Sequence, residues 1–202
     1  MAARDGKVRR VVYAASSSAY GAQDRMPFTE DMTARPMSLY AFQKFAGEEY
    51  ARLFAELYGL EAVSLRFFTV YGPGMRPDGG YALAIPRFLQ NRKDGVPLPI
   101  TGDGEQTRDF THVADVVRAC MLAAASPEVG KGEVFNVAAG RNVSVNHLAD
   151  LIGGPREYVP VRPGDVPDTY GDNRKAREVL GWEPQVALED GIRELKAEWG
   201  IA

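Results

Sequence analysis

The chain has 202 residues, of which 45% are hydrophobic and 25% are charged, and these fractions exclude a disordered or collagen-like protein. The count of 24 Lys and Arg against 27 Asp and Glu gives a net charge of −3, which argues against a nucleic-acid partner. One cysteine and two histidines exclude an internal disulfide and argue against a metal site. No apolar run approaches the ~18 residues of a membrane span, and Met1–Lys7 lacks the apolar region of a signal peptide. We therefore expect a cytoplasmic protein that has no membrane partner.

The first predicted elements form a strand–helix–strand unit. The run Val8–Ala15 is apolar, contains β-branched and aromatic residues and ends in three serines, which predicts a strand buried on both faces. The residues before it, Ala2–Lys7, resemble the end of a helix that a glycine closes. A long helix is predicted over Ser38–Tyr58, and a second buried strand over Glu61–Val70. We expect the crossover between these strands to be right-handed.

The long predicted helix is amphipathic. Ser38 is a suitable N-cap and Gly59 ends the helix. The residues at helical spacing on its apolar side are Leu39, Phe42, Ala46, Tyr50, Leu53 and Leu57, and those on its polar side are Glu48, Glu49, Arg52 and Glu56.

The second half of the chain contains more turns. We predict a core strand over Glu133–Ala138 and helices over Tyr81–Asn91, Val113–Ala125, Val145–Leu151 and Leu188–Trp199. The stretch from Gly153 to Gly171 is rich in proline and glycine and carries several ionisable residues. Loops of this composition carry function more often than packing, so we expect a binding region beside a regular sheet.

Tyr40 and Lys44 have the spacing Y-x-x-x-K inside the long helix, so they lie on the same helical face. A lysine ammonium near a phenol favours the phenolate, which is the form that removes a proton from a sugar hydroxyl. Ser16 ends the first predicted strand, and open α/β folds bind ligands at the carboxyl ends of their strands. In isolation, each signal also fits a surface Tyr–Lys pair or an ordinary polar strand end.

Several motifs in order resemble the NAD-dependent epimerase/dehydratase family, the extended short-chain dehydrogenase/reductases, and within it the UDP-glucose and UDP-N-acetylglucosamine 4-epimerase group. These motifs are Tyr13-Ala-Ala-Ser-Ser-Ser-Ala-Tyr-Gly21, Tyr40-Ala-Phe-Gln-Lys44, Leu65-Arg-Phe-Phe-Thr-Val-Tyr-Gly-Pro73, Gly102-Asp-Gly-Glu-Gln-Thr-Arg-Asp-Phe-Thr-His-Val113, Arg162-Pro-Gly-Asp165 and Leu180-Gly-Trp-Glu-Pro184.

The resemblance implies a catalytic triad of Ser16, Tyr40 and Lys44 and a bound NAD. In the family, the tyrosinate removes the proton of the sugar 4-hydroxyl while a hydride passes from C4 to NAD. The resulting 4-keto sugar then turns over and takes the hydride back on its other face. Lys44 is expected to hold the cofactor ribose together with Tyr40, and the backbone of Phe68 to contact the nicotinamide end.

The resemblance also implies residues that bind a nucleotide-sugar substrate. Arg108 and Arg162 match arginines that hold the nucleotide diphosphate, and guanidinium groups suit bidentate phosphate contacts. Asp165 belongs to the same motif as Arg162, which is Arg162-Pro-Gly-Asp165. Thr169 matches the residue that limits the size of the sugar, and its small side chain predicts that N-acetylhexosamines are accepted.

Three further positions bear on the reaction. Ser17 and Ser18 stand where dehydratases and decarboxylases of the family have acidic residues, which favours epimerisation over elimination. Thr69 stands where many epimerases have asparagine, and uronate epimerases resemble this version. Ser17 and Thr69 are both assigned to substrate binding.

The chain contains no G-x-G-x-x-G or G-x-x-G-x-x-G motif, the turn that brings a cofactor pyrophosphate to a helix N-terminus. Family members carry it before the segment matched here. We therefore predict an α/β fold that is only the C-terminal part of such a protein: a partial Rossmann-type parallel sheet with a C-terminal α/β substrate-binding lobe, the N-terminal mononucleotide half being missing. Residues 1–72 are assigned to the Rossmann domain and 73–202 mainly to the substrate lobe, with 112–138 returning to the Rossmann domain.

The predicted function is that of a nucleotide-sugar 4-epimerase that needs the missing N-terminal half for activity. A separate chain or upstream sequence would supply that half. The alternatives are a non-catalytic remnant that binds a nucleotide sugar or a partner, and a UDP-uronate 4-epimerase or sugar dehydratase. The helix over residues 39–58 resembles the dimerisation helix of the family, which implies a homodimer.

Overall fold

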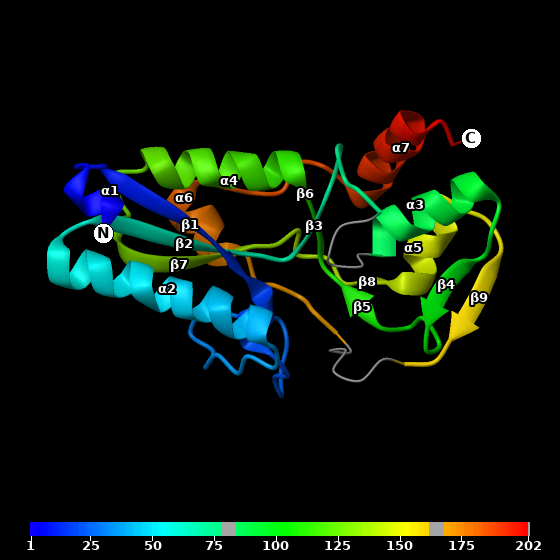
Figure 1. Cartoon of the computed structure of the whole chain (residues 1–202), viewed down its shortest axis with the longest axis horizontal. Coiled ribbons are helices and arrows are strands. Elements are labelled where there is room, and N and C mark those ends of the chain that lie inside the picture. Colours follow the sequence, from blue (N-terminus) through cyan, green and yellow to red (C-terminus); the bar gives the residue numbers. More distant parts are fainter. Residues whose placement is uncertain (78–83, 162–167, 202) are drawn as a thin grey trace.

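The computed structural model describes residues 1–77, 84–161 and 168–201. A three-stranded parallel sheet, in the order β1-β2-β7, forms the lobe at the left of Figure 1. Its strands are β1 (Arg10–Ser16), β2 (Glu61–Phe67) and β7 (Lys131–Val137). The register of β1 with β2 runs without a break from Arg10 opposite Glu61 to Ser16 opposite Phe67. The last residues of β1 and β2 therefore lie side by side.

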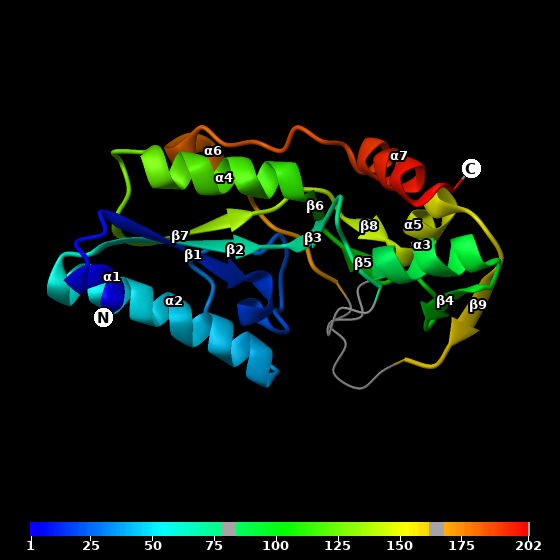
Figure 2. The same cartoon turned by 45° about the horizontal axis from the view of Figure 1, so that its top comes forward.

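Helices cover both faces of this sheet. Helix α2 (Leu39–Tyr58) lies along one face, while α4 (Val113–Ala125) and α6 (Arg174–Leu180) lie on the other, as Figures 1 and 2 show. The predicted α/β class and Rossmann-type parallel arrangement are confirmed. The predicted fold class needs one correction, because it described a partial sheet without its mononucleotide half. A doubly covered parallel sheet of the nucleotide-binding type is present among the described residues.

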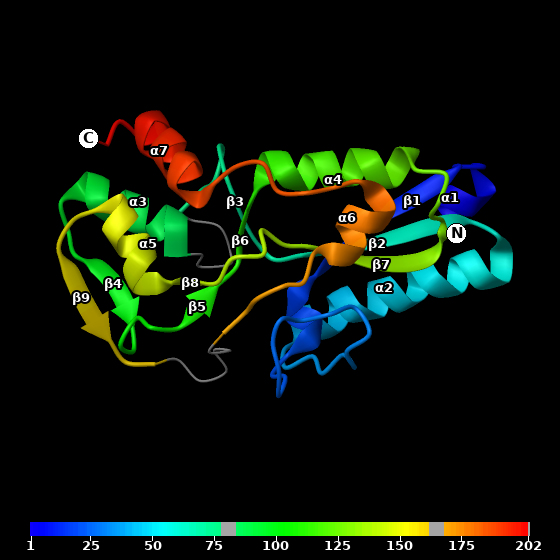
Figure 3. The ribbon, with the colours of Figure 1, turned by 180° about the vertical axis from the view of Figure 1, so that it is seen from behind.

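Among the described residues, the second lobe has short strand pairs and three helices around its own core. Strands β3 (Thr69–Tyr71) and β6 (Phe110–His112) pair in parallel where the lobes meet, as seen from behind in Figure 3. The remaining strand pairs are β4 (Leu98–Thr101) with β9 (Arg156–Val159) and β5 (Thr107–Arg108) with β8 (Val143–Ser144). The helices are α3 (Ala84–Asp94), α5 (Val145–Ile152) and α7 (Leu188–Trp199). None of the helices in the described parts of the chain is long and apolar enough to cross a membrane.

The long predicted elements are found, with shifts at their ends. The helices predicted over Val113–Ala125 and Leu188–Trp199 coincide with α4 and α7, and the first predicted strand is found as β1. Helix α3 is described from Ala84, and Tyr81, the predicted start, lies outside the described residues. The helix end predicted at the N-terminus is found as α1 (Ala2–Asp5). A 3-10 turn, η1 (Ser17–Tyr20), follows β1.

The second predicted strand is in fact two strands. Its residues divide into β2 and β3, which have different partner strands, and Phe68 lies between them. The N–H of Phe68 still donates to the carbonyl of Val137, at 3.1 Å. The chain therefore leaves the main sheet at this residue and enters the second lobe.

Helix α2 corrects the sequence-based interpretation of its faces. Ser38 caps its first turn through a 3.1 Å bond from the N–H of Ala41, and Gly59 ends it in a left-handed conformation, as predicted. However, Glu48, which was assigned to the polar side, is only 2% exposed. Most of the predicted apolar side is exposed instead, namely Leu39, Phe42, Tyr50, Leu53 and Leu57. The helix turns its small residues and Glu48 toward the sheet.

Candidate functional site

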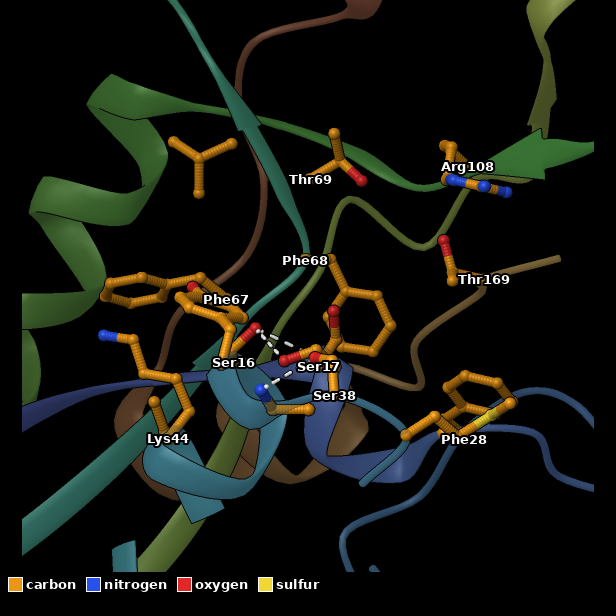
Figure 4. A pocket seen from close by; sticks show the side chains of 17 residues that line it. Ser16, Ser17, Phe28, Ser38, Lys44, Phe67, Phe68, Thr69, Arg108 and Thr169 are labelled. Atoms are coloured by element: carbon orange, nitrogen blue, oxygen red, sulfur yellow. Dashed lines mark hydrogen bonds between the residues drawn. The ribbon is translucent and has the colours of Figure 1, made fainter. Parts of the chain in front are cut away.

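A cavity of about 470 Å³ lies at the carboxyl ends of β1 and β2, between the two lobes (Figure 4). Every predicted site residue that the structure describes lines this cavity: Ser16, Ser17, Tyr40, Lys44, Phe68, Thr69, Arg108 and Thr169. Arg162 and Asp165 lie outside the described residues. The cavity thus combines residues from the main sheet, α2 and the second lobe.

Ser16 lines the cavity from the edge of the main sheet, because it is the last residue of β1 and the N-cap of η1. Its Oγ accepts a hydrogen bond from the N–H of Ser18, at 3.2 Å, and another from the Ser18 hydroxyl, at 2.9 Å (Figure 4). A serine hydroxyl has one hydrogen to donate and two lone pairs to accept, so Ser16 keeps its own hydrogen for a ligand oxygen. The serine run is therefore a turn that orients one hydroxyl.

Tyr40 and Lys44 lie in the first turns of α2, on the face toward the end of β1. The Nζ atom of Lys44 is 5.9 Å from the centre of the Tyr40 ring and donates to the carbonyl of Ala14, at 2.8 Å. Tyr40 is 39% exposed, so a ligand in the cavity can reach its ring. The Ala14 carbonyl thus holds a positive charge beside the phenol.

A second phenol, Tyr13, lies close to the same ammonium but does not line the cavity. Its ring centre is 5.7 Å from the Nζ of Lys44. The ring packs where Gly47 has no side chain, because a Cβ built on Gly47 would be 2.1 Å from the Tyr13 Oη. Burial, followed by the nearby charges of Glu48 and Tyr40, raises the pKa of Tyr13. Tyr13 therefore stays a neutral packing residue, and Tyr40 is the candidate base.

A buried polar network supports the floor of the site, and the sequence analysis did not single it out. Glu48 and Arg66 form a two-point ion pair, with 2% and 4% of each residue exposed. The Arg66 guanidinium lies 4.5 Å from the centre of the Tyr20 ring, and the Tyr20 hydroxyl donates to Asn136 at 2.7 Å. Burial is the main cause that raises the pKa of Tyr20 to about 12. An arginine inside a strand predicted to be buried was the available signal, since such a charge needs a buried partner.

The opposite wall of the cavity comes from the second lobe and the segment 168–172. Arg108 and Thr169 lie together there (Figure 4). The N–H of Thr169 donates to the Thr107 carbonyl at 3.2 Å, and the N–H of Thr107 donates to the carboxylate of Asp168 at 3.0 Å. The Oγ1 of Thr169 is buried and has no hydrogen-bond partner among the described residues. This wall can offer a guanidinium and a hydroxyl to a ligand.

Asp109 follows Arg108 and is a further residue that the sequence analysis did not single out. It is 0% exposed and accepts hydrogen bonds from the N–H groups of Ala139, at 2.7 Å, and Gly140, at 3.0 Å. Burial raises the pKa of Asp109 to about 7, although these N–H groups act in the opposite direction. The carboxyl group of this R-D-F motif is thus fully buried and bonded to backbone N–H groups.

The comparisons with known proteins identify the family. The model of the NAD dependent epimerase/dehydratase family matches residues 1–138. The UDP-glucose 4-epimerase of Mycolicibacterium smegmatis is 41% identical over 198 residues, covering 95% of this chain and 62% of the relative. The UDP-glucuronate 4-epimerase of Thermodesulfobacterium geofontis is 37% identical, covering 94% of this chain and 59% of the relative.

Solved structures agree with these relatives. The UDP-N-acetylglucosamine 4-epimerase from Methanobrevibacter ruminantium, in complex with UDP-N-acetylmuramic acid, has a TM-score of 0.91 at 33% identity. The similarity covers 98% of this chain and 65% of that one. The UDP-glucuronic acid 4-epimerase from Bacillus cereus, in complex with UDP-glucuronic acid and NAD, has a TM-score of 0.90 at 29% identity and covers 98% and 64%. The chain thus spans about three fifths of the length of the relatives it matches.

These matches correct the prediction about which part of such a protein the chain represents. The prediction assigned it to the C-terminal part only, with the N-terminal mononucleotide half missing. The family model instead begins at residue 1 and ends at residue 138, and the two relatives align over 94–95% of the chain, which contradicts that prediction. The expectation that a separate N-terminal half is a partner of this chain is therefore withdrawn as well. By its family match, its relatives and its fold, the chain belongs to the NAD dependent epimerase/dehydratase family.

Proposed function

We propose that the cavity is the active site of a nucleotide-sugar 4-epimerase acting on a UDP-hexose or a UDP-N-acetylhexosamine. The observation that carries this proposal is the single cavity in which Ser16, Tyr40 and Lys44 face Arg108 and Thr169. One side offers groups that move a proton, and the other offers groups that hold an anion. The names of the relatives, which are UDP-sugar 4-epimerases, support the same reaction class.

The residues present fit the nicotinamide and ribose end of NAD, which supplies the acceptance and return of a hydride at the sugar C4 when it is bound. The ammonium of Lys44 has three hydrogens and gives one to the Ala14 carbonyl, so further donors remain for ribose hydroxyls. The N–H of Phe68 is used by Val137, so its carbonyl is the backbone group left for the nicotinamide amide.

In this proposal, the Tyr40 oxygen takes the proton from the 4-hydroxyl of the sugar, and the Ser16 hydroxyl donates to the same oxygen. The charge of Lys44 stabilises the negative charge on the phenol oxygen. Loss of the hydride from C4 and of the proton from its oxygen leaves a 4-keto sugar. Return of the hydride to the other face of C4 and of the proton to the oxygen completes the epimerisation. Ser17 and Ser18, next to Ser16, have no ionisable group near neutral pH, so they supply no acid or base for an elimination.

The Arg108 guanidinium is proposed to bind the diphosphate of the substrate. A planar guanidinium can hold phosphate oxygens at two points, which keeps the nucleotide fixed while the sugar turns. The small side chain of Thr169 leaves room beside the sugar for an N-acetyl group. Thr69, which lines the same cavity, favours a UDP-uronate as the second candidate substrate.

The exposed apolar side of α2 supports a homodimer formed through this helix. Leu39 is 84% exposed, Tyr50 and Leu57 are 65% exposed and Phe42 is 60% exposed. Several large apolar side chains exposed along one helix are typical of an interface between proteins. We expect the chain to sediment as a dimer, and the substitution Leu57→Glu to produce a monomer. A wild-type chain that sediments as a monomer at micromolar concentration would contradict this.

The test of the proposed function measures binding and turnover on the same preparation. UDP-glucose, UDP-N-acetylglucosamine and UDP-glucuronate are each titrated by calorimetry and then incubated with the chain and NAD, and the C4 epimers are quantified by NMR. We expect binding of at least one UDP-sugar and a product that the Tyr40→Phe variant does not form. Full activity of Tyr40→Phe would refute the assignment of the base, whereas binding without turnover would support the non-catalytic alternative.

A further inference from the structure

We propose that Asp109 is a positioning residue that holds the substrate wall of the cavity, formed by Arg108 and Thr169, in its binding conformation. This inference rests on the proposed role of that wall in binding the UDP-sugar. Asp109 does not line the cavity itself, so it acts through the backbone segments that do.

The Asp109 carboxyl group joins three segments that are far apart in the sequence. Its Oδ1 accepts from the N–H of Ala139 at 2.7 Å, and its Oδ2 accepts from the N–H groups of Gly140 and Gly171 at 3.0 and 3.3 Å. Ala139 and Gly140 follow β7 of the main sheet, whereas Asp109 lies between β5 and β6 of the second lobe. One fully buried side chain therefore connects the sheet, the second lobe and the segment 168–172.

The segment 168–172 is a strap whose position depends on this connection. On one side the N–H of Thr169 donates to the Thr107 carbonyl, at 3.2 Å. On the other side the N–H of Phe28 donates to the Tyr170 carbonyl at 2.7 Å, and the N–H of Asp172 donates to the Phe28 carbonyl at 2.9 Å. The strap thus has partners at both edges, and the carboxyl group of Asp109 is its polar partner in the middle.

Gly171 lets the strap approach the floor of the cavity closely. A Cβ built at this position would lie 2.5 Å from the Cβ of Ala138 and 2.6 Å from the Cζ of Phe68. Only a residue without a side chain fits there, so Gly171 has no side chain that could hold the strap in place. The N–H of Gly171 instead donates to the carboxyl group of Asp109, at 3.3 Å and two residues from Thr169, and the bonds of Phe28 hold the residues on either side.

The neighbour of Asp109 on its other side is Arg108. Because the two residues are adjacent, any shift of the Asp109 backbone that follows the loss of its hydrogen bonds also displaces the guanidinium of Arg108. Loss of the carboxyl acceptors is therefore expected to move both halves of the substrate wall while leaving Ser16, Tyr40 and Lys44 in place. The expected consequence is weaker binding of the UDP-sugar and not a failure of the proton-transfer residues.

Asp115 provides a control with a second buried carboxylate, which also pairs with Arg118 at 3.0 Å. It is 1% exposed and its carboxylate also accepts from backbone N–H groups, those of Gln185 and Val186, at 3.0 to 3.1 Å. It connects α4 to the segment before α7 and holds no residue that lines the cavity. A general effect of removing a buried carboxylate would therefore appear in both positions, and an effect on positioning only at Asp109.

The experiment compares the wild-type chain with Asp109→Asn and Asp115→Asn. An asparagine amide keeps one acceptor oxygen, but its NH₂ group faces N–H donors, so the contacts of one carboxylate oxygen are lost, either that with Ala139 or those with Gly140 and Gly171. We expect Asp109→Asn to raise the calorimetric Kd for UDP-glucose at least tenfold, and, where turnover is measured, to raise KM with kcat changed less than threefold. Asp115→Asn is expected to stay within twofold of the wild-type Kd. Unchanged binding in Asp109→Asn, or equal weakening in both variants, would overturn the proposal.

Hydrogen exchange gives a readout that does not depend on the ligand. We expect exchange in the strap and at Ala139 and Gly140 to be at least tenfold faster in Asp109→Asn than in the wild type, and unchanged in Asp115→Asn. If the wild-type chain binds none of the three UDP-sugars, the proposed function fails, but this comparison still decides whether Asp109 holds the wall. If Asp109→Asn does not fold, the wild type alone decides: amides of Ala139, Gly140 and Gly171 that exchange as fast as exposed loop amides would overturn the proposal.

Discussion

Replacing Glu48 by glutamine tests the buried ion pair that supports the floor of the cavity. The side chains of Glu48 and Arg66 are 3% and 5% exposed, and two nitrogen atoms of Arg66 contact the two carboxylate oxygens. Glutamine has nearly the same shape but no charge, so the guanidinium stays buried without its counter-charge. Breaking one partner of a buried pair costs about 3–5 kcal/mol. We expect the lower end, about 3 kcal/mol, because the Tyr20 ring still lies 4.5 Å from the guanidinium.

A matched control lies on the same helix. Glu56 pairs with Arg52 at 2.8 Å, but the side chains are 61% and 45% exposed. Such pairs contribute about 0.3–0.5 kcal/mol, so Glu56→Gln should be almost neutral. The free energies of unfolding are measured by urea denaturation at pH 7 for the wild type and both variants. A loss below 1 kcal/mol in Glu48→Gln, or equal losses in the two variants, would refute the reasoning that burial decides the contribution of these charges.

Three further changes probe the packing and the electrostatics of the fold. Gly47→Ala places a Cβ 2.1 Å from the Tyr13 Oη. We expect its free energy of unfolding, measured by urea denaturation, to fall by about 1–3 kcal/mol in spite of alanine's better helix propensity. A more stable variant would contradict this. Arg10→Met removes the donors that bind four backbone carbonyls at and after the end of α4, at 2.6 to 3.3 Å. We expect this change to lower the free energy of unfolding by about 2–4 kcal/mol. A change below 0.5 kcal/mol in the same assay would show that water replaces these donors. The pKa of Asp109 is raised by burial to about 7, so the folded chain binds this proton more tightly than the unfolded chain, and the resulting stabilisation is complete below about pH 4 and lost as the pH rises through 7. A shift of roughly three units corresponds to at most about 4 kcal/mol, so the stability of Asp109→Asn relative to the wild type should increase between pH 5 and pH 8, and a constant or decreasing difference would contradict the sign.

The sequence alone determined the features that depend on neighbouring residues. The end of β1 at Ser16, the cap at Ser38 and the left-handed end at Gly59 follow from local backbone preferences, and the structure has all three. The spacing of Tyr40 and Lys44 places them on one helical face for the same reason. The motifs also identified the family correctly, since motif residues and their order can be read without a structure.

Other features were decided only by the tertiary structure. Periodicity shows which residues of α2 share a face but not which face meets the sheet, so it could not show that Glu48 is buried and Leu39 exposed. Strands of two to four residues, such as β5, have too little pattern of their own and exist because a distant strand pairs with them. The contact of Asp109 with Gly171 joins residues separated by 62 positions. Local preference acts between neighbouring residues, whereas burial and pairing depend on where distant segments meet, and only the folded chain brings Arg108 and Thr169 to the cavity of Tyr40.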